Sequence, residues 1–298
     1  MKAGREVVRC GLVLALIMAA CAPSEPASEP EEAAAPEPEI DFVQEAVWAP
    51  RGDRLLATWN QGDRFRLYGV MAPDTTGAAV EASTGLRVSD GPDMSAAWAP
   101  DRVWVAFGST RDGNGEIYRM RPDGMQEENL TNHEADDREP TYSPDGRQIA
   151  FISDRTDGVP RLHIMDADGS NVRMVGSPQG LSHHAPEWSP DGTRIALHVT
   201  MDEAAFVYVA TPEGGWGRVK RGELPSWSPN SEVIYFGREG GLFAVRVQTN
   251  GLRDLEITGS APHVSPDGRW LAYIRGEWPV SALYATDLAT GEEYRLTR

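Results

Sequence analysis

Residues 139–153 read Glu-Pro-Thr-Tyr-Ser-Pro-Asp-Gly (139–146), then Arg-Gln-Ile-Ala-Phe-Ile-Ser (147–153). A short run ending in an aromatic residue meets a Pro-Asp-Gly turn, and a second run rich in β-branched and aromatic residues leaves it. In such a turn Pro144 presets φ, Asp145 accepts hydrogen bonds from its own turn, and Gly146 tolerates a positive φ. The stretch therefore predicts a β-hairpin.

This stretch recurs six times along the chain. The turn prolines lie 37 to 50 residues apart, and an aromatic residue stands two positions before five of them. The turn prolines are Pro50, Pro100, Pro144, Pro190, Pro229 and Pro266. The residues two positions earlier are Trp48, Trp98, Tyr142, Trp188, Trp227 and, in the sixth copy, Val264. Each turn is followed by two further β-rich runs and, in most copies, by a fourth weaker one.

Four antiparallel strands in about 43 residues, repeated six times, are typical of a β-propeller. The sequence thus predicts an all-β fold, a six-bladed β-propeller of four-stranded antiparallel blades over residues 41–298. The first and last copies are both complete, so the ring need not be closed by a strand shared between the two ends. The sequence alone leaves the mode of closure open.

The net charge and the cysteine content limit the kinds of partner and site that are expected. The chain has 298 residues and a formal net charge of −17. Such a surface repels the phosphates of nucleic acid and the headgroups of anionic lipid, so neither is an expected electrostatic partner. Both cysteines, Cys10 and Cys21, lie in the first 21 residues, which leaves the propeller without a disulfide or a thiolate metal site. No cofactor is expected, and we expect a monomer.

The N-terminal residues have the pattern of an export signal. Basic residues precede ten apolar residues (11–20), too few for a spanning helix, and Cys21 follows directly. Residues 22–40 are rich in Pro, Glu and Ala and contain no basic residue, which predicts a disordered tether. We therefore expect a signal peptide over residues 1–20 and a tether over residues 21–40. An ordinary signal peptide with an incidental cysteine is the alternative.

Two resemblances refine these expectations. The stretch Met18-Ala19-Ala20-Cys21 resembles the lipobox of bacterial lipoproteins, although Leu is usual where Met18 stands. This resemblance implies lipidation of Cys21, and Ala22 after it favours the outer over the inner membrane. The stretch from Tyr142 to Arg155, with Ile164-Met-Asp-Ala-Asp-Gly169, resembles the TolB-type propeller repeat. Asn129-Leu-Thr-Asn-His133 belongs to the same pattern.

The propeller resemblance is specific for fold and weak for function. TolB proteins are periplasmic, carry an α/β domain before the propeller and bind a peptidoglycan-associated lipoprotein. Here a tether precedes the propeller, so a direct role of that kind is not expected. Related peptidases carry an α/β-hydrolase domain after the propeller, but this sequence stops after its sixth copy and contains no Gly-x-Ser-x-Gly motif. A non-catalytic module is therefore the leading hypothesis.

Two loops faintly resemble calcium sites, namely Asp166-x-Asp168-Gly169-x-Asn171 and Asp112-Gly-Asn114-Gly-Glu116. Neither has the bidentate Glu of an EF-hand, and both fall where the repeat places a turn. The Asp residues of the Pro-Asp-Gly turns are likewise interpreted as turn formers. These residues are expected to be structural.

Candidate binding residues gather on the opposite rim, formed by the loops that lead into each first strand and the loops between second and third strands. They are His133, Asp136, Asp137, Arg138, Glu139, His183, His184, Glu187, His263, Arg111, Arg155 and Trp278. Solvated loop residues are the alternative interpretation. A site for Zn or Mn built from His and carboxylates is another, although no His pair has ligand spacing within one element.

The sequence thus supports a lipid-anchored propeller at the periplasmic face of the cell envelope, with its rim binding an envelope protein or peptide. The alternatives are a small metal-dependent or sugar-acting enzyme, such as a lyase or lactonase with its site in the central depression, and a purely structural envelope component. No catalytic residue or metal ligand is assigned. The sequence does not identify the partner or ligand.

Overall fold

The hairpin predicted at residues 139–153 is present. β9 (Asp137–Tyr142) pairs with β10 (Gln148–Ser153), and the turn between them is closed by Ser143 N donating to Gln148 O at 2.9 Å. The Asp145 carboxylate accepts the Ser143 hydroxyl at 2.6 Å, while Gly146 has a φ of 71°. Each residue of the turn therefore has the role that its chemistry predicts.

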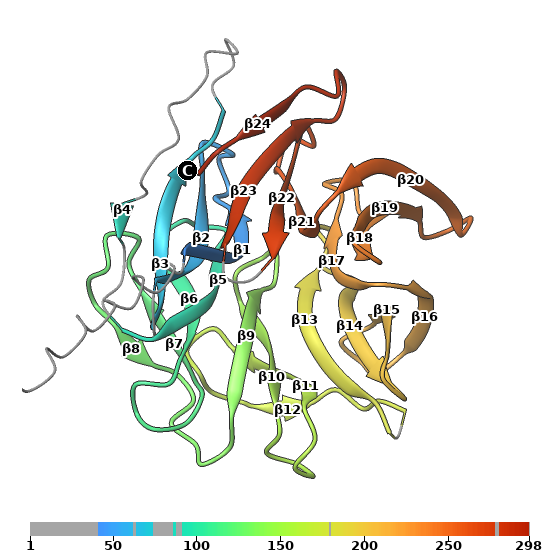
Figure 1. The fold of residues 1–298 in the computed structure, drawn as a ribbon. Helices are drawn as coiled ribbons and strands as arrows, with labels where there is room; N and C mark the ends of the chain where they lie inside the picture. The colour runs from blue at the N-terminus through green and yellow to red at the C-terminus, as the bar shows by residue number, and fades with distance from the viewer. Residues whose placement is uncertain are drawn as a thin grey trace, which may run out of the picture. The chain divides into compact units, whose positions relative to one another are not determined.

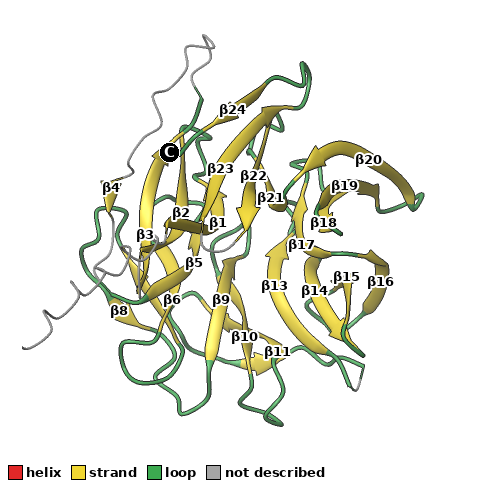
Figure 2. Ribbon diagram, in the orientation of Figure 1, coloured by secondary structure: helices red, strands yellow, loops and turns green. Residues whose placement is uncertain are grey.

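The computed structural model describes residues 41–61, 64–73, 86–87, 91–178, 180–277 and 280–297. These residues form 24 strands and no helix, arranged as six blades around a ring (Figures 1 and 2). The predicted six-bladed propeller is therefore confirmed. The predicted signal peptide (1–20), Cys21 and the tether (21–40) lie outside the described residues. Within the described part no helix is long and apolar enough to cross a membrane.

Each blade consists of four strands that are consecutive in sequence. Blade 1 contains β1 (Asp41–Trp48), β2 (Arg54–Gln61), β3 (Arg64–Met71) and β4 (Leu86–Arg87). Blade 2 contains β5 (Asp93–Trp98), β6 (Val105–Ser109), β7 (Glu116–Met120) and β8 (Glu128–Asn129). Blade 3 adds β11 (Arg161–Asp166) and β12 (Arg173–Met174) to β9 and β10.

The other three blades repeat this arrangement. Blade 4 contains β13 (Ser182–Trp188), β14 (Ile195–Met201), β15 (Ala204–Ala210) and β16 (Trp216–Arg221). Blade 5 contains β17 (Glu223–Trp227), β18 (Val233–Arg238), β19 (Gly241–Arg246) and β20 (Gly251–Thr258). Blade 6 contains β21 (Ser260–Val264), β22 (Trp270–Glu277), β23 (Val280–Asp287) and β24 (Glu293–Arg295). The first strands of the blades lie nearest the centre of the ring (Figure 1).

The hydrophobic core lies between blades. Six clusters of buried residues are present, and each combines side chains from two neighbouring blades. The repeated aromatic position supplies these interfaces, with Trp48, Tyr142, Trp188 and Trp227 all less than 9% exposed. Burial of large apolar side chains contributes roughly 2–3 kcal/mol each. A blade alone would lose both of its interfaces, so the ring is the stabilising unit.

Contacts between blade 6 and blade 1 close the ring. The Ser281 hydroxyl on β23 donates to Val43 O and accepts from Val43 N on β1, both at 2.8 Å. A single parallel bridge pairs Asp41 with Val280, and one hydrophobic cluster contains Trp48 of blade 1 and Trp270 of blade 6. Among the described residues, no strand is exchanged between these blades. The ring is therefore closed by the contacts of β1 with β23 and by side chains packed between blades 1 and 6. The complete first and last copies are consistent with this mode of closure.

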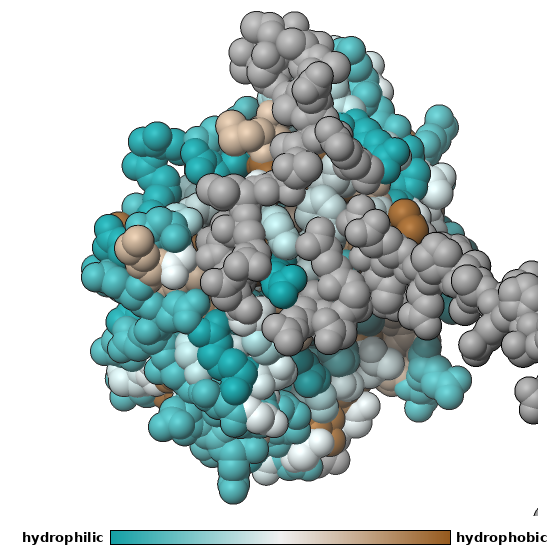
Figure 3. All heavy atoms as spheres, turned by 60° about the vertical axis from the view of Figure 1, so that its left-hand side comes forward, coloured by the Kyte–Doolittle hydropathy of each residue, from teal (hydrophilic) through white to brown (hydrophobic). Residues whose placement is uncertain are grey.

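The surface carries few apolar side chains. The large hydrophobic residues that are exposed include Met125, Met174, Leu252 and Val280, which come from different blades. Apart from the grey atoms, the face drawn in Figure 3 is mostly hydrophilic, with hydrophobic residues as separate spots. Scattered single residues of this kind are normal for a folded surface.

Candidate functional site

The first strands, which lie nearest the centre of the ring, each carry a β-bulge. Each shows a register shift against its neighbour three or so residues before the repeated aromatic position. The residues with positive φ at this position are Ser95, Glu139, Ala185, Leu224 and Ala261, with φ between 45° and 56°. A non-glycine residue in this region costs about 1 kcal/mol, and a bulge re-aims the side chains beside it.

Two carboxyl groups use this geometry to join neighbouring blades. Glu139 Oε2 on β9 accepts Ala185 N on β13 at 2.7 Å. One blade further on, Glu187 Oε1 accepts Trp227 N on β17 at 2.9 Å. A side-chain oxygen on one innermost strand therefore accepts a backbone N–H of the next, and for Ala185 this N–H lies at the bulge of its strand.

Glu45 on β1 belongs to the same group of side chains. Its Oε1 accepts the Thr58 hydroxyl at 3.0 Å, and its pKa is raised by burial and by the negative charge of Glu139. Burial also raises the pKa of Glu139. We name Glu45, Glu139, Glu187 and His263 the central cluster, since all four lie on innermost strands.

Glu187 and His263 are close but do not form a hydrogen bond. Glu187 Oε2 lies 3.9 Å from His263 Nε2, and the two side chains are 22% and 26% exposed. Burial raises the pKa of Glu187 to about 8 and lowers the pKa of His263 to about 4. Both groups are therefore mainly uncharged at neutral pH, so their proximity is not an ion pair.

A cation borders this cluster at the incoming-loop rim, the rim made by the loops leading into the first strands. Arg138 precedes Glu139 on β9, and its side chain makes no hydrogen bond or ion pair with any residue that the structure describes. Its positive charge counteracts the burial that raises the pKa of Glu139. Burial lowers the pKa of His184, and the charge of Arg138 lowers it further. His184 Nε2 lies 3.1 Å from the Ser182 hydroxyl.

Arg111 and Arg155, two other predicted rim residues, each stabilise their own blade. Arg111 pairs with both oxygens of the buried Asp93 at 2.7 and 2.9 Å and also bonds Ser109 at 3.0 Å. Arg155 pairs with Asp137, which is fully buried, at 2.5 Å. Both ion pairs link the start of a first strand to the end of a second strand. Their guanidinium groups are therefore committed within their own blades.

The remaining predicted rim residues lie apart from the central cluster. His133 and Asp136 are exposed loop residues, with His133 Nδ1 accepting Ala135 N and Asp136 Oδ1 accepting Gly115 N. His183 is buried, its Nδ1 accepts Leu162 N, and burial lowers its pKa to about 3. Trp278 lies outside the described residues.

The sequence profile of the TolB beta propeller domain matches residues 80–260 of the chain. The chain belongs to this family. An uncharacterized protein of Agrobacterium fabrum is 32% identical over 160 residues, which are 50% of this chain and 52% of that protein. An uncharacterized peptidase of Bacillus subtilis is 32% identical over 149 residues, 48% of this chain and 22% of that protein. This chain thus matches about half the length of the first relative and about a fifth of the length of the second.

Solved structures agree with the fold. The crystal structure of TolB from Acinetobacter baumannii superposes with a TM-score of 0.59 at 22% identity, over 75% of this chain and 57% of that one. At this identity the likeness concerns the fold alone. The functional properties of the TolB-type propeller therefore depend on its own residues.

Sequence reasoning found Glu139, Glu187 and His263 but missed Glu45. The signal was present, because Glu45 and Glu139 each stand three residues before the repeated aromatic residue. Glu187 stands one residue before Trp188, and His263 stands one residue before Val264, which takes the aromatic position in the sixth copy. Aligning the copies by their aromatic position therefore brings out the polar centre of this TolB-type propeller. Among the residues described, no group of three or more His, Cys, Asp or Glu is placed to hold a metal ion.

Proposed function

We propose that this TolB-type propeller is a binding module of the bacterial cell envelope that takes an acidic segment of a protein partner at its incoming-loop rim. The observation that carries the proposal is Arg138. It lies beside Glu139, whose pKa is raised by burial, and its side chain makes no ion pair with a described residue. A cation whose neighbours favour their neutral forms stays available to an incoming carboxylate.

The chemistry of the surrounding groups supports this assignment. The chain has a net charge of −17, so an acidic partner needs a local positive site to approach. Charge-assisted hydrogen bonds from a guanidinium to a carboxylate are roughly twice as strong as neutral ones. His184, held uncharged by burial and by Arg138, adds a neutral imidazole at the same rim. A side-chain carboxylate or the C-terminus of a partner would suit this set.

The location in the envelope is part of the proposal. The apolar run before Cys21 and its lipobox-like residues support export and lipidation of Cys21. Mass spectrometry of the mature N-terminus is expected to show an acylated cysteine, which Cys21→Ser abolishes. Fractionation of the envelope then decides between outer and inner membrane. An unmodified N-terminus at Cys21 would contradict the anchor.

The binding role is tested by comparing two arginines. The propeller with Arg138→Ala and the propeller with Arg147→Ala lose the same charge, but Arg147 is an exposed residue of a turn on the opposite rim. Both proteins, and the unmodified one, are immobilised and exposed to an envelope extract. A partner is then expressed separately, and its affinity for all three is measured by calorimetry. We expect Arg138→Ala alone to weaken binding about tenfold.

The proposal fails if no partner distinguishes Arg138→Ala from Arg147→Ala. Competition supplies a second readout, since a short acidic peptide from the partner should displace it and the corresponding amide peptide should not. High salt should slow association, because the contact is electrostatic and solvent-exposed. An affinity that is insensitive to both changes would point to an apolar contact elsewhere.

A further inference from the structure

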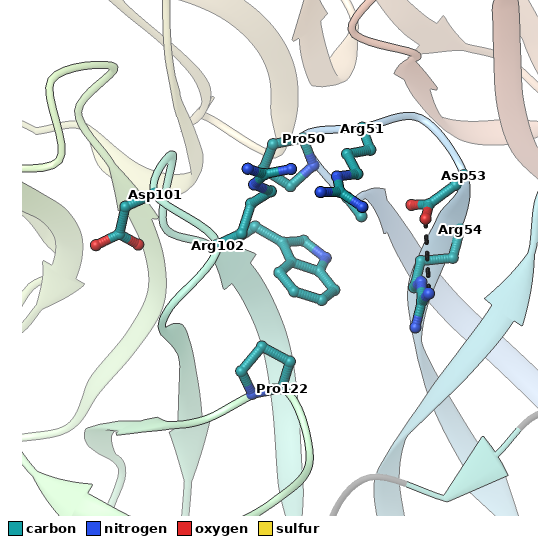
Figure 4. Close-up of a pocket in the computed structure, with 9 residues that line it drawn as sticks. Pro50, Arg51, Asp53, Arg54, Asp101, Arg102 and Pro122 are labelled. Carbon is teal, nitrogen blue, oxygen red and sulfur yellow. Dashed lines mark ion pairs between the residues drawn. The ribbon is translucent and has the colours of Figure 1, made fainter.

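A cavity of about 370 Å³ lies on the turn rim, the rim that carries the Pro-Asp-Gly turns. It opens between blades 1 and 2, far along the first strands from Arg138. The residues that concern its chemistry are Arg51, Asp53, Arg54, Trp98, Asp101 and Arg102. Figure 4 shows the side chains of Arg51 and Arg102 reaching from the two turns toward its opening. This volume falls in the range of small-ligand sites.

Both arginines depart from the repeat at this point. Aligning the turns by their closing hydrogen bonds places Arg51 where blade 3 has Asp145, and Arg102 where blade 3 has Gly146. In blade 3, Asp145 accepts two hydrogen bonds within its turn, from the Ser143 hydroxyl and a backbone N–H. In blade 1 the position of Ser143 is taken by Ala49, which has no hydroxyl, so only the backbone N–H bond is at stake. Arginine cannot accept that bond, which forfeits about 1 kcal/mol of turn stabilisation.

Arg102 departs in backbone conformation as well. Its φ is 64°, the left-handed region that Gly146, Gly192 and Gly268 occupy at the same position of other turns. A side chain there costs about 1 kcal/mol. Two neighbouring turns therefore each carry a local cost, and both costs place a guanidinium at one cavity. Strain that recurs at one place is a reason to look for a site.

Trp98 is the third departure. At the repeated aromatic position, Trp48, Tyr142, Trp188 and Trp227 are all less than 9% exposed, whereas Trp98 is only half-buried. Trp98 lines the cavity, so its indole ring gives the site an apolar surface. A flat apolar wall beside two guanidinium groups suits an anion attached to a planar or apolar group.

The charges at the cavity do not cancel, because three arginines and two aspartates line it. Arg54 pairs with Asp53 at 3.5 Å (Figure 4), and Asp101 accepts Val103 N at 2.8 Å within its turn. The side chains of Arg51 and Arg102 make no hydrogen bond or ion pair with a residue in the described part of the chain. Two free cations thus face one cavity in a protein whose net charge is −17. Their mutual repulsion is relieved by a bound anion.

We propose that this cavity is a binding site for a doubly charged oxyanion, best matched by the phosphate of a small phosphate monoester. Two guanidinium forks match the two charges and the oxygens of a phosphate. The Trp98 ring contacts the organic part of the ester. The site is separate from the proposed protein-binding rim, and Arg138→Ala leaves it unchanged.

The test uses the sequence of the repeat itself. The variant Arg51→Asp/Arg102→Gly restores the residues of the other turns, so it is expected to unfold at the same temperature or higher. Inorganic phosphate, phenyl phosphate and phenol are titrated by calorimetry at constant ionic strength. We expect phenyl phosphate to bind more tightly than inorganic phosphate, and phenol not to bind. The double variant should weaken phenyl phosphate binding by about tenfold or more.

Arg147→Ala serves as the matched control, because it removes an exposed arginine from the turn of blade 3. Its affinity for phenyl phosphate should equal that of the unmodified protein. The proposal is overturned if phenyl phosphate fails to bind at about 10 mM, which corresponds to less than about 3 kcal/mol of binding free energy. It is equally overturned if the double variant binds as tightly as the unmodified protein, or if Arg147→Ala weakens binding as much.

Discussion

Replacing Glu187 by glutamine is expected to remove a pH-dependent cost from the folded state. The pKa of Glu187 is about 8 in the folded protein, against a value of 4.5 without the influence of the fold. Between these values the unfolded chain loses the proton while the folded protein keeps it. Stability therefore falls as the pH rises from about 4.5 to 8, and levels off above the folded pKa.

The magnitude follows from the two pKa values. Each pH unit within the window changes the free energy of unfolding by about 1.4 kcal/mol. Raising the pH from 5.5 to 8 then costs the unmodified protein about 3 kcal/mol through Glu187. In Glu187→Gln the amide oxygen still accepts Trp227 N, but nothing ionises. The variant should thus gain about 3 kcal/mol relative to the unmodified protein across this range.

Urea unfolding at pH 5.5 and 8, followed by circular dichroism, measures this difference for both proteins. Glu213→Gln, on an exposed loop, is the control and should change little at either pH. Other titrating groups are common to both proteins and cancel in the comparison. A difference between Glu187→Gln and the unmodified protein that is the same at both pH values would show that Glu187 ionises normally, and the reasoning about burial at the centre would be refuted.

Four further substitutions test the framework of the propeller. Arg155→Ala leaves the buried carboxylate of Asp137 without its partner and should lower the free energy of unfolding by about 3 kcal/mol, measured by urea denaturation. Gly146→Ala places a side chain at a φ of 71° and should cost about 1 kcal/mol, whereas Arg102→Gly should gain a similar amount in the same assay. Burial lowers the pKa of His183 to about 3, so the folded protein keeps this side chain neutral while the unfolded chain binds a proton below pH 6.5. The free energy of unfolding therefore falls as the pH is lowered. In His183→Asn, about 2 kcal/mol of the fall between pH 7.5 and 5 should be absent from the unfolding curves.

The fold was predictable because its evidence is local and repeated. The Pro-Asp-Gly turn specifies a hairpin through the chemistry of three residues, and the aromatic residue before it, such as Trp188, fills the interface between blades. The turn proline occurs six times and the aromatic residue before it five times, which leaves little freedom in the architecture. The closure by Ser281 was not predictable, since it joins residues 238 positions apart through one hydroxyl group. Nothing in the local sequence distinguishes that serine from its neighbours.

The candidate site was predictable only in part, because a side chain's role depends on its partners. Arg111 and Arg155 were chosen as rim cations, and the structure places both in ion pairs with buried aspartates. Glu187 was chosen as a rim carboxylate, and it lies at the centre with a raised pKa. Burial and pairing are properties of the assembled ring. The residue types indicated polarity correctly but did not show which charges remain free.

In a repeat protein, a residue that departs from the repeat indicates a position with a role other than building the fold. The turns of blades 3, 4 and 6 keep Asp and Gly, as Asp145 and Gly146 illustrate, and these residues serve the turn. In two adjacent turns Arg51 and Arg102 replace these residues and cannot play their part in the turn. Trp98, which lies between them, is only half-buried. Each change alone would be a weakened copy. Together they enclose one cavity with two free cations and an indole, which independent decay of three positions does not explain.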